Sequence, residues 1–413
     1  MVTEKIFEAA LSISSPWYIA GMSFEPSQRK LMIRVDFEVG SRFAVPGASG
    51  EHPVHDTVTK TYRHLNFFQH ECELEVRIPR VRLPDGSVRQ VSPPWAGKLS
   101  GFTLLFEAFL LLLCREMPFS GVARITGVSL HRVMALAERY VNAAVGAADF
   151  SEVRRLAIDE TSRAKGHDYV TVFADEPGRK VINVAEGNDT ATVAAFAANL
   201  RAHHGKPTEI ESVSIDMWPA FIRGITENFP NAQITFDKFH VISHASTAID
   251  AMRRREQKLD PSLKGLRWTL LKDRSRLSIA QRAELDALLA HMTSNRTARA
   301  WLYREQLREI LARKQPNVVR LMLRQWCTNV LRSKVEPMKE VAQLILKHFD
   351  GILAWVTTRQ TNGFLEAINS LFQAAKRKAR GYVRFSTIRT VIFLIAGKLD
   401  FSRLNPYVVT QPT

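Results

Sequence analysis

Cysteine is scarce in this sequence, which contains three among 413 residues: Cys72, Cys114 and Cys327. Three widely spaced cysteines cannot form a disulfide framework, and they do not make a zinc site by themselves. We therefore expect all three to be buried, reduced thiols.

Long apolar runs are also missing. The longest candidate, residues 104–114, is shorter than the roughly 18–20 residues that a membrane-spanning helix needs, and it contains Glu107. The N-terminus has an acid at position 4 and lacks the apolar core and cleavage site of a secretory signal. The sequence thus predicts a cytoplasmic, nucleoid-associated protein with no membrane partner.

Acidic residues are outnumbered by basic ones. The chain has 41 Asp and Glu against 57 Lys and Arg, which gives a formal net charge of +16. A charge of this size favours a polyanionic partner. Internal repeats and low-complexity tracts are absent too, so domain boundaries must be sought in changes of periodicity.

The first two regions differ in period. Residues 1–97 contain short alternating segments, such as 30–36 and 73–81, between Gly/Pro-rich turns, and predict a small β-rich module. Residues 98–150 have a helical period. Within them, Gly127 separates two short helices and Ser129 is placed to cap the second, which predicts a helix-turn-helix. A plain helical hairpin is the alternative.

The second half of the chain alternates differently. Residues 151–240 are interpreted as three strands followed by helix, strand, helix and strand, which predicts a mixed sheet covered by helices. Residues 241–355 are charged amphipathic helices and predict an inserted α-helical domain. Residues 356–400 are then expected to complete the sheet domain.

Two carboxylates follow apolar runs of this sheet region. Asp159 follows residues 156–158 and Asp216 follows residues 213–215, so both are expected at strand ends. In an open sheet, sites gather at such ends, and neighbouring strands would bring the two carboxylates together. Mg²⁺ prefers hard oxygen ligands of this kind. Taken alone, however, an Asp after a strand is more often a turn or capping residue.

A third acid lies on the amphipathic helix predicted over residues 361–380. Its polar face is formed at alternating steps of four and three by Asn362, Glu366, Asn369, Gln373, Lys376 and Arg380. Glu366 thus shares a face with amides and cations that suit phosphate contact. A solvated helix face is the ordinary alternative.

Several motifs occur together in a recognisable order. They are VDFEVGSRF (35–43), YRHLNFF (62–68), RIPRVRL (77–83), PPWA (93–96), AIDET (157–161), SIDMWPAF (214–221), FDKFHV (236–241), TNGFLEAIN (361–369) and KRKARGY (376–382). In these motifs the chain resembles the insertion-sequence transposases of the ISL-three type, which belong to the DDE superfamily.

The resemblance implies an α+β multidomain fold. A ribonuclease-H-like mixed α/β catalytic domain (151–240 and 356–400) with a large all-α insertion (241–355) would follow the β-rich module and the helix-turn-helix. It also implies that Asp159, Asp216 and Glu366 are the catalytic and metal-binding triad. Two Mg²⁺ ions, or Mn²⁺ in their place, are the expected cofactors.

The pair Asp237 and His240 forms a D-x-x-H that resembles an accessory motif of related transposases with helical insertions. Two hypotheses stay open for His240: a structural residue that anchors the first insertion helix, and direct contact with DNA or the nucleophile. Neither residue is expected to be a primary metal ligand.

The N-terminal module departs from the family, whose members usually carry a zinc ribbon there. The expected cysteine positions read VPGA (45–48) and LPDG (83–86). We predict that Val45, Ala48 and Leu83 pack in place of the metal, and that the protein holds no zinc. Stoichiometric zinc in a metal analysis of the purified protein would contradict this.

The predicted function is that of a DNA transposase, which binds terminal inverted repeats and catalyses 3′-end cleavage and strand transfer. Double-stranded DNA is the expected partner, with a homodimer or larger assembly formed on it. The candidate DNA-binding residues are Ser129, His131, Arg132, Asn362, Asn369, Lys376, Arg377 and Arg380. The alternatives are a catalytically silent regulator derived from a transposase and a nuclease of the same fold that cleaves without joining.

Overall fold

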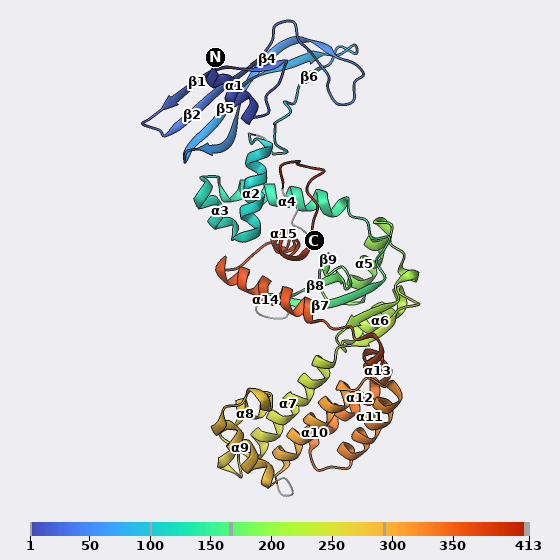
Figure 1. Ribbon diagram of the computed structural model, residues 1–413. Helices are drawn as coiled ribbons and strands as arrows, with labels where there is room; N and C mark the ends of the chain where they lie inside the picture. Colours follow the sequence, from blue (N-terminus) through green and yellow to red (C-terminus); the bar gives the residue numbers. More distant parts are fainter. Residues whose placement is uncertain (1, 100, 165–167, 292–294, 409–413) are drawn as a thin grey trace. The chain divides into compact units, whose positions relative to one another are not determined.

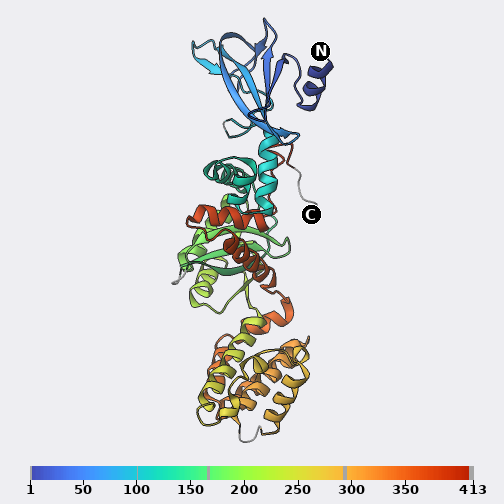
Figure 2. The same ribbon diagram turned by 90° about the vertical axis from the view of Figure 1, so that its left-hand side faces the viewer.

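The computed structural model describes residues 2–99, 101–164, 168–291 and 295–408 (Figures 1 and 2). The chain separates into two compact units, one formed by Met1–Gly146 with Ala374–Thr413 and the other by Ala147–Gln373. Each unit is described by itself below.

A six-stranded sheet forms the N-terminal part of the first unit, in the order β1-β2-β5-β4-β3 with β6 beside β5. Its strands are β1 (Trp17–Glu25), β2 (Lys30–Phe37), β3 (Arg42–Phe43), β4 (His52–Phe67), β5 (His70–Arg82) and β6 (Val88–Gln90). The β-rich prediction is confirmed, but β4 and β5 are long, and the chain begins with helix α1 (Val2–Ala10). The ring of Phe7 on α1 contacts that of Phe67 at the end of β4.

Alternate side chains of this sheet enter one apolar core. Val45 and Leu83 are buried in it and Ala48 packs against it, as predicted for the positions where relatives have zinc ligands. Cys72 lies in the same core, and Cys72, Cys114 and Cys327 are all buried free thiols, as predicted. Apolar packing of these side chains therefore stabilises the module, and the absence of zinc stays a prediction.

The helices of the first unit confirm the helix-turn-helix. They are α2 (Leu104–Glu116), α3 (Phe119–Thr126), α4 (Leu130–Gly146) and α15 (Phe385–Ala396). Gly127 ends α3 in the left-handed region, with φ of 71°, where a residue without a Cβ is favoured. The predicted break between the two helices is thus a true turn.

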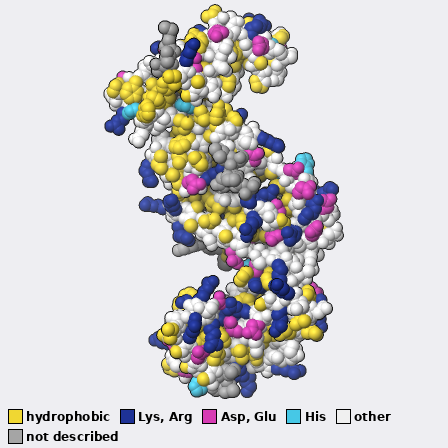
Figure 3. Space-filling model, viewed as in Figure 1, with side chains coloured by type: hydrophobic (Ala, Val, Ile, Leu, Met, Phe, Trp, Pro, Cys, Tyr) yellow, Lys and Arg dark blue, Asp and Glu magenta, His cyan; other side chains and the backbone are white. Residues whose placement is uncertain are grey.

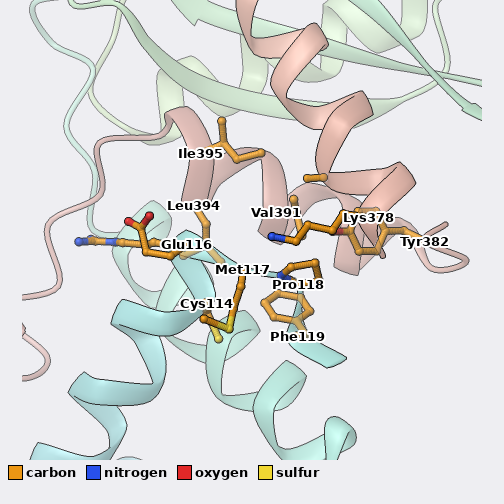
Figure 4. Close-up of a pocket in the computed structure, with 12 residues that line it drawn as sticks. Cys114, Glu116, Met117, Pro118, Phe119, Lys378, Tyr382, Val391, Leu394 and Ile395 are labelled. Carbon is orange, nitrogen blue, oxygen red and sulfur yellow. The ribbon is translucent and has the colours of Figure 1, made fainter. Parts of the chain in front are cut away.

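Helix α15 comes from the far end of the chain and packs on this motif. Figure 4 shows Cys114, Met117 and Phe119 from the α2–α3 region facing Val391 and Leu394 of α15 around a cavity of about 100 Å³. The sequence prediction had assigned residues up to 400 to the catalytic domain. In the structure α15 buries its apolar face in the first compact unit, and the bounds of the catalytic domain stay a prediction.

A five-stranded mixed sheet organises the second unit, in the order β11-β10-β7-β8-β9. Its strands are β7 (Arg155–Ala164), β8 (Asp168–Asp175), β9 (Lys180–Glu186), β10 (Ser212–Ile215) and β11 (Gln233–Phe236). Strands β7, β8 and β9 are antiparallel, whereas β10 runs parallel to both β7 and β11. Helices α5 (Thr190–Ala202) and α6 (Pro219–Asn228) connect the last strands. This is the predicted order of elements.

A block of helices follows β11 in the same unit, as predicted. It contains α7 (Lys238–Glu256), α8 (Arg267–Leu271), α9 (Ile279–Ala290), α10 (Arg296–Ala312), α11 (Pro316–Leu331), α12 (Glu336–Lys347) and α13 (Phe349–Thr358). Figures 1 and 2 show α7, α10, α11 and α12 side by side. One apolar core runs from the sheet into this block.

The block is joined closely to the sheet through α13 and β11. A Cβ added to Gly351 would lie 2.4 Å from the Phe236 ring, so the helix reaches the strand only because this residue is glycine. Helix α14 (Gly363–Lys378) then returns the chain to β7. None of the described helices has the length and apolarity to cross a membrane.

Candidate active site

The first two predicted carboxylates lie on neighbouring strands. Asp216 directly follows the last residue of β10, as predicted. Asp159 was expected at a strand end, but it lies within β7 and pairs with Val172 of β8. On its other side, pairing between β7 and β10 stops at Ala157. Asp159 therefore lies just beyond the last pair of residues that joins β7 to β10. Asp216 directly follows β10 at the same edge.

Three hydrogen bonds hold this part of β7 in place, two to the Asp159 carboxylate and one to the carbonyl of the next residue, Glu160. Its Oδ1 accepts from the Glu160 N–H at 2.8 Å, and its Oδ2 accepts from Asn369 Nδ2 at 2.8 Å. The same Asn369 amide lies 3.3 Å from the Glu160 carbonyl. Asn369 was predicted to bind DNA, but the structure uses its amide to orient Asp159.

The charge balance around Asp159 is negative. Burial first, and then the charge of Asp216, raises the pKa of Asp159 to about 7, with a smaller contribution from Glu366. The Glu160 N–H and His240 oppose this rise. The raised pKa thus reflects first the burial of Asp159 and then its closeness to a second carboxylate.

His240 contacts the other carboxylate. Its Nε2 lies 2.7 Å from Asp216 Oδ1, an ion-pair distance without the angles of an aligned hydrogen bond. Burial alone would lower the pKa of His240, but the surrounding acids Asp216, Asp159 and Asp237 outweigh it, and the pKa is raised. His240 thus lies beside the carboxylates at the start of α7, which is compatible with both hypotheses made for it.

Asp237 is a buried structural anchor. Its Oδ1 caps α7 by accepting from the Phe239 N–H at 2.9 Å, and its Oδ2 accepts from the Asn362 N–H at 2.6 Å. Asn362 in turn donates from Nδ2 to the Ile158 carbonyl at 3.3 Å. These bonds join the start of α7 and the start of α14 to β7, one residue before Asp159.

The polar face of α14 was predicted to contact phosphate, and three of its amides contact other parts of the protein in this structure. Asn362 is fully buried, and Gln373 donates to Thr161 Oγ1 at 3.1 Å and to the Ser162 carbonyl at 2.9 Å. With Asn369, these amides attach the helix to the backbone and side chains of β7. Their N–H donors are bonded to protein groups, although the buried Asn362 Oδ1 has no partner among the described residues, so this stripe attaches the helix to β7.

Glu366 lies on the same helix, with an exposed side chain. It is near enough to raise the pKa of Asp159. Within the described residues, however, no three acidic, histidine or cysteine side chains are grouped closely enough to hold a metal ion. The predicted three-ligand set is not closed in this conformation, although its donors are the hard oxygens that Mg²⁺ prefers.

Sequence reasoning missed a second polar pair at this edge. Asn188 donates from Nδ2 to Glu160 Oε2 at 3.3 Å, and its carbonyl lies 3.3 Å from Trp218 Nε1. Burial, with the charge of Asp216, raises the pKa of Glu160. The adjacent acids in AIDET were the only sign of it in the sequence.

The remaining predicted residues belong to the first unit. Ser129 and His131 are exposed at the start of α4, whereas Arg132 places its guanidinium 3.9 Å from the centroid of the Phe102 ring. Arg377 and Arg380 are exposed, in the last turn of α14 and just after it, and Lys376 is half-buried. The Arg132 side chain therefore packs in part on the Phe102 ring. The other residues stay candidates for DNA binding.

Two of the three arginines at residues 253–255, on α7, pair with an acid of the same helix. Arg253 is buried and pairs with Asp250 at 2.8 Å, and Arg254 pairs with the same carboxylate at 3.1 Å. Trp355 is also buried, between Lys238 and Arg359, which are 4.6 Å and 4.4 Å from its ring.

This arrangement of sheet, carboxylates and helix-turn-helix defines a class of DNA-processing protein, the DDE transposases. The family model for the DDE domain of ISL3 transposases matches residues 156–392. A second model, described as the helix-turn-helix domain of transposase family ISL3, matches residues 91–141. The chain belongs to the ISL3 family of transposases, and membership implies DNA binding and transposition.

Two insertion-sequence transposases are similar over most of their length. The chain is 29% identical over 340 residues to the transposase for insertion sequence element IS1001 of Bordetella parapertussis, covering 80% of this chain and 82% of the relative. It is 27% identical over 419 residues to the transposase for IS1557 of Mycobacterium tuberculosis (strain CDC 1551 / Oshkosh), covering 92% of each.

Proposed function

We propose that this transposase cuts the 3′ ends of its element and joins them to target DNA at Asp159, Asp216 and Glu366. The observation that carries the proposal is the convergence of two carboxylates from neighbouring strands, with Glu366 near enough to raise the pKa of Asp159. The strand order and directions support a ribonuclease-H-like catalytic domain with the helical block as its insertion.

The three carboxylates would hold divalent cations, which transposases of the DDE class generally use. Bound Mg²⁺ would supply activation of the attacking oxygen and neutralise the charge on the leaving 3′-oxygen. Asn369 keeps Asp159 oriented, the Asp237–Asn362 bond joins the start of α14 to the start of α7, and Asn362 Nδ2 joins it to β7. The exposed Glu366 side chain is free to change rotamer and complete the ligand set.

The test is an assay of cleavage and joining. Purified protein is incubated in Mg²⁺ with labelled DNA from the ends of the insertion sequence and a target plasmid, beside an Asp159→Asn control. Nicking at the element boundary with joining of the 3′ end, by wild type alone, supports the proposal. Binding without any broken phosphodiester bond favours the regulator, and cleavage without joining favours the nuclease.

For DNA recognition we propose that the start of α4 reads base edges while the turn after α14 contacts phosphates. Lys and Arg side chains form scattered groups on the visible face in Figure 3, and the chain as a whole has a net charge of +16. The proposal includes a homodimer or larger assembly on the two element ends. It also includes the division of the chain into four domains.

A pair of variants separates these two kinds of contact. His131→Ala should lower affinity for the terminal repeat by about 5- to 100-fold and leave non-specific binding unchanged, because a base-edge contact contributes about 1–3 kcal/mol. Arg377→Ala should weaken binding to the terminal repeat and to non-specific DNA alike. It should also reduce the slope of log affinity against log salt concentration by about one. The measurement is fluorescence anisotropy over a salt series, with Arg320→Ala, an exposed arginine of α11, as the control.

Equal loss of specific and non-specific affinity in His131→Ala would contradict base reading by α4. If Arg377→Ala and the control show the same salt dependence of DNA binding, the turn after α14 is not part of the DNA-binding surface.

A further inference from the structure

Aromatic side chains gather at one end of the N-terminal sheet, where β1 turns into β2 and β4 turns into β5. The ring centroids of Phe67 and Phe68 are 4.4 Å apart, and that of Phe67 is 5.4 Å from the ring of Phe7 on α1. His70 pairs with Phe67 in the sheet, and its ring is 5.0 Å from that of Phe24. We call these five residues the aromatic patch. Figure 3 shows hydrophobic side chains gathered over this end of the sheet.

Much of the aromatic patch faces solvent. Phe68 is 81% exposed, Phe24 45% and Phe67 36%. A phenylalanine side chain buries about 150–250 Å² when it is covered, so these three rings leave about 300 Å² of apolar surface open on one copy. Exposed apolar patches of about this size on soluble proteins often serve binding. The DNA contacts and the chemistry proposed above use none of these residues.

The backbone at the tip of the β4–β5 hairpin is strained in a way that keeps a phenylalanine outside. Phe68 and Gln69 connect the paired residues Phe67 and His70, with φ of 44° and 67°. Positive φ at both positions is the geometry of a type I′ turn, in which Asn-Gly is a favoured pair. A bulky side chain is rare there, because its Cβ crowds the backbone. Strain that presents an exposed ring is a sign of a function for that ring.

The charges around the aromatic patch are balanced. Within residues 24–30 and 63–73, acids and bases are equal in number: Glu25, Glu71 and Glu73 against Arg29, Lys30 and Arg63. Lys30 pairs with Glu73 at 2.7 Å, and Arg63 pairs with Glu71 at 3.4 Å. DNA and anionic lipid surfaces are bound by clusters of uncompensated Lys and Arg. In a chain with a net charge of +16, this neutral apolar surface therefore suits a protein partner.

We propose that the aromatic patch binds the same patch of a second copy of this chain, so that the protein is a dimer before it meets DNA. A twofold contact requires a surface that is complementary to itself, and an apolar centre flanked by equal numbers of acids and bases meets that requirement. The inference does not depend on the proposed cleavage chemistry.

The exposed area sets the strength of this dimer. Protein interfaces are about 57% apolar, so about 300 Å² of apolar surface on each copy corresponds to about 1,000–1,100 Å² buried in total. This area is at the low end for a specific dimer. The dimer should therefore be weak enough to dissociate on dilution.

Sedimentation of the full-length protein without DNA, across a dilution series, measures the dimer Kd. Wild type is compared with Phe68→Asn and Phe24→Ser, which each remove a ring of the patch, and with Leu321→Asn. Leu321, on α11 in the second unit, is 70% exposed and is the matched control for loss of an exposed apolar side chain. The melting temperature of each variant at the highest dilution reports its folding.

Phe68→Asn and Phe24→Ser should each raise the dimer Kd by at least about 100-fold, because a twofold interface loses the ring twice. Leu321→Asn should leave the Kd unchanged. In dilute solution Phe68→Asn should melt no lower than wild type, because asparagine accepts a positive φ more readily than phenylalanine.

Wild type that stays monomeric at every concentration overturns the proposal, as does a dimer that survives both substitutions in the patch. A Phe68→Asn protein that melts well below wild type in dilute solution would show that the ring packs within one copy, which also overturns it. Loss of DNA affinity in Phe68→Asn with no change in the dimer Kd would assign the patch to DNA instead.

Discussion

The Asp159→Asn variant is expected to lose DNA cleavage and strand transfer by at least about a thousand-fold. Ligands of catalytic metal ions contribute several kcal/mol to transition-state stabilisation, and about 4 kcal/mol corresponds to three orders of magnitude in rate. The amide keeps the size of the side chain and one acceptor oxygen, so the loss would come from the missing charge. Rates of nicking and joining of labelled element ends measure it.

The same variant is expected to be more stable than wild type when no divalent metal is present. The pKa of Asp159 is raised from its ordinary value of 3.8 to about 7 in the folded protein, mainly by burial and by Asp216. An acid whose pKa is higher in the folded than in the unfolded protein stabilises the native state only while it is protonated. This stabilisation is lost as the pH rises from about 4 to about 7. Asparagine mimics the protonated acid and avoids the loss.

The gain in Asp159→Asn should therefore be near zero at pH 4, increase up to about pH 7 and stay constant above it. Its upper limit is about 4 kcal/mol, and partial exposure of the site reduces the value to about 1–2 kcal/mol. Thermal unfolding in EDTA across this pH range measures it, with Asp286→Asn, a 52% exposed aspartate, as control.

Added Mg²⁺ should then reverse the order, because it binds the ionised carboxylates of wild type and stabilises only the form that binds it. A variant that is less stable than wild type at pH 8 without metal would contradict the charge balance described for this site. Unchanged melting of wild type in Mg²⁺ would contradict metal binding there.

Asp237→Ala is expected to destabilise the second unit by about 2–4 kcal/mol and to abolish detectable cleavage. Asp237 is 0% exposed, and its removal leaves the Phe239 and Asn362 N–H groups without their acceptors. Loss of a helix cap costs about 1 kcal/mol, and a buried unpaired N–H about 1–3 kcal/mol more. Cleavage should fail because the start of α14, which carries Glu366, is no longer tied to the start of α7.

Thermal unfolding and the cleavage assay measure the two effects, and Asp237→Asn separates them. Asparagine still caps a helix, but it has one acceptor for two donors, so its stability should fall between those of Ala and wild type. Asp286→Ala should shift stability by less than about 1 kcal/mol, as exposed ion pairs contribute little. An Asp237→Ala protein as stable as this control would disprove the anchoring role.

Periodicity predicted the arrangement of the second unit well. The apolar runs before Asp159 and Asp216 became β7 and β10, and these strands are neighbours, as expected. Buried strands of a mixed sheet are mostly apolar, so their pattern is visible in the sequence without knowledge of the fold, even though β10 also buries Ser212 and Ser214. The position of Asp159 inside β7 was not visible, because strand length depends on the antiparallel partner β8.

The polar face of α14 was located from its spacing but misinterpreted. The spacing shows that Asn362, Asn369 and Gln373 share one side of a helix, and this is correct. It cannot show whether that side meets solvent, DNA or another part of the chain. In the structure it meets β7, whose hydrogen-bonding groups from Ile158 to Ser162 accept from all three amides.

The sequence by itself determined the local elements of this protein, its basic character and its family resemblance, because periodicity, charge and motif order are properties of the chain alone. Only the tertiary structure decided which groups satisfy one another. The contact of His240 with Asp216 and the bond from Asn362 to Asp237 join residues whose proximity depends on strand order and helix packing. The bond from Asn362 to Asp237 spans 125 positions in the chain and that from Gln373 to Thr161 spans 212, and no local pattern encodes them.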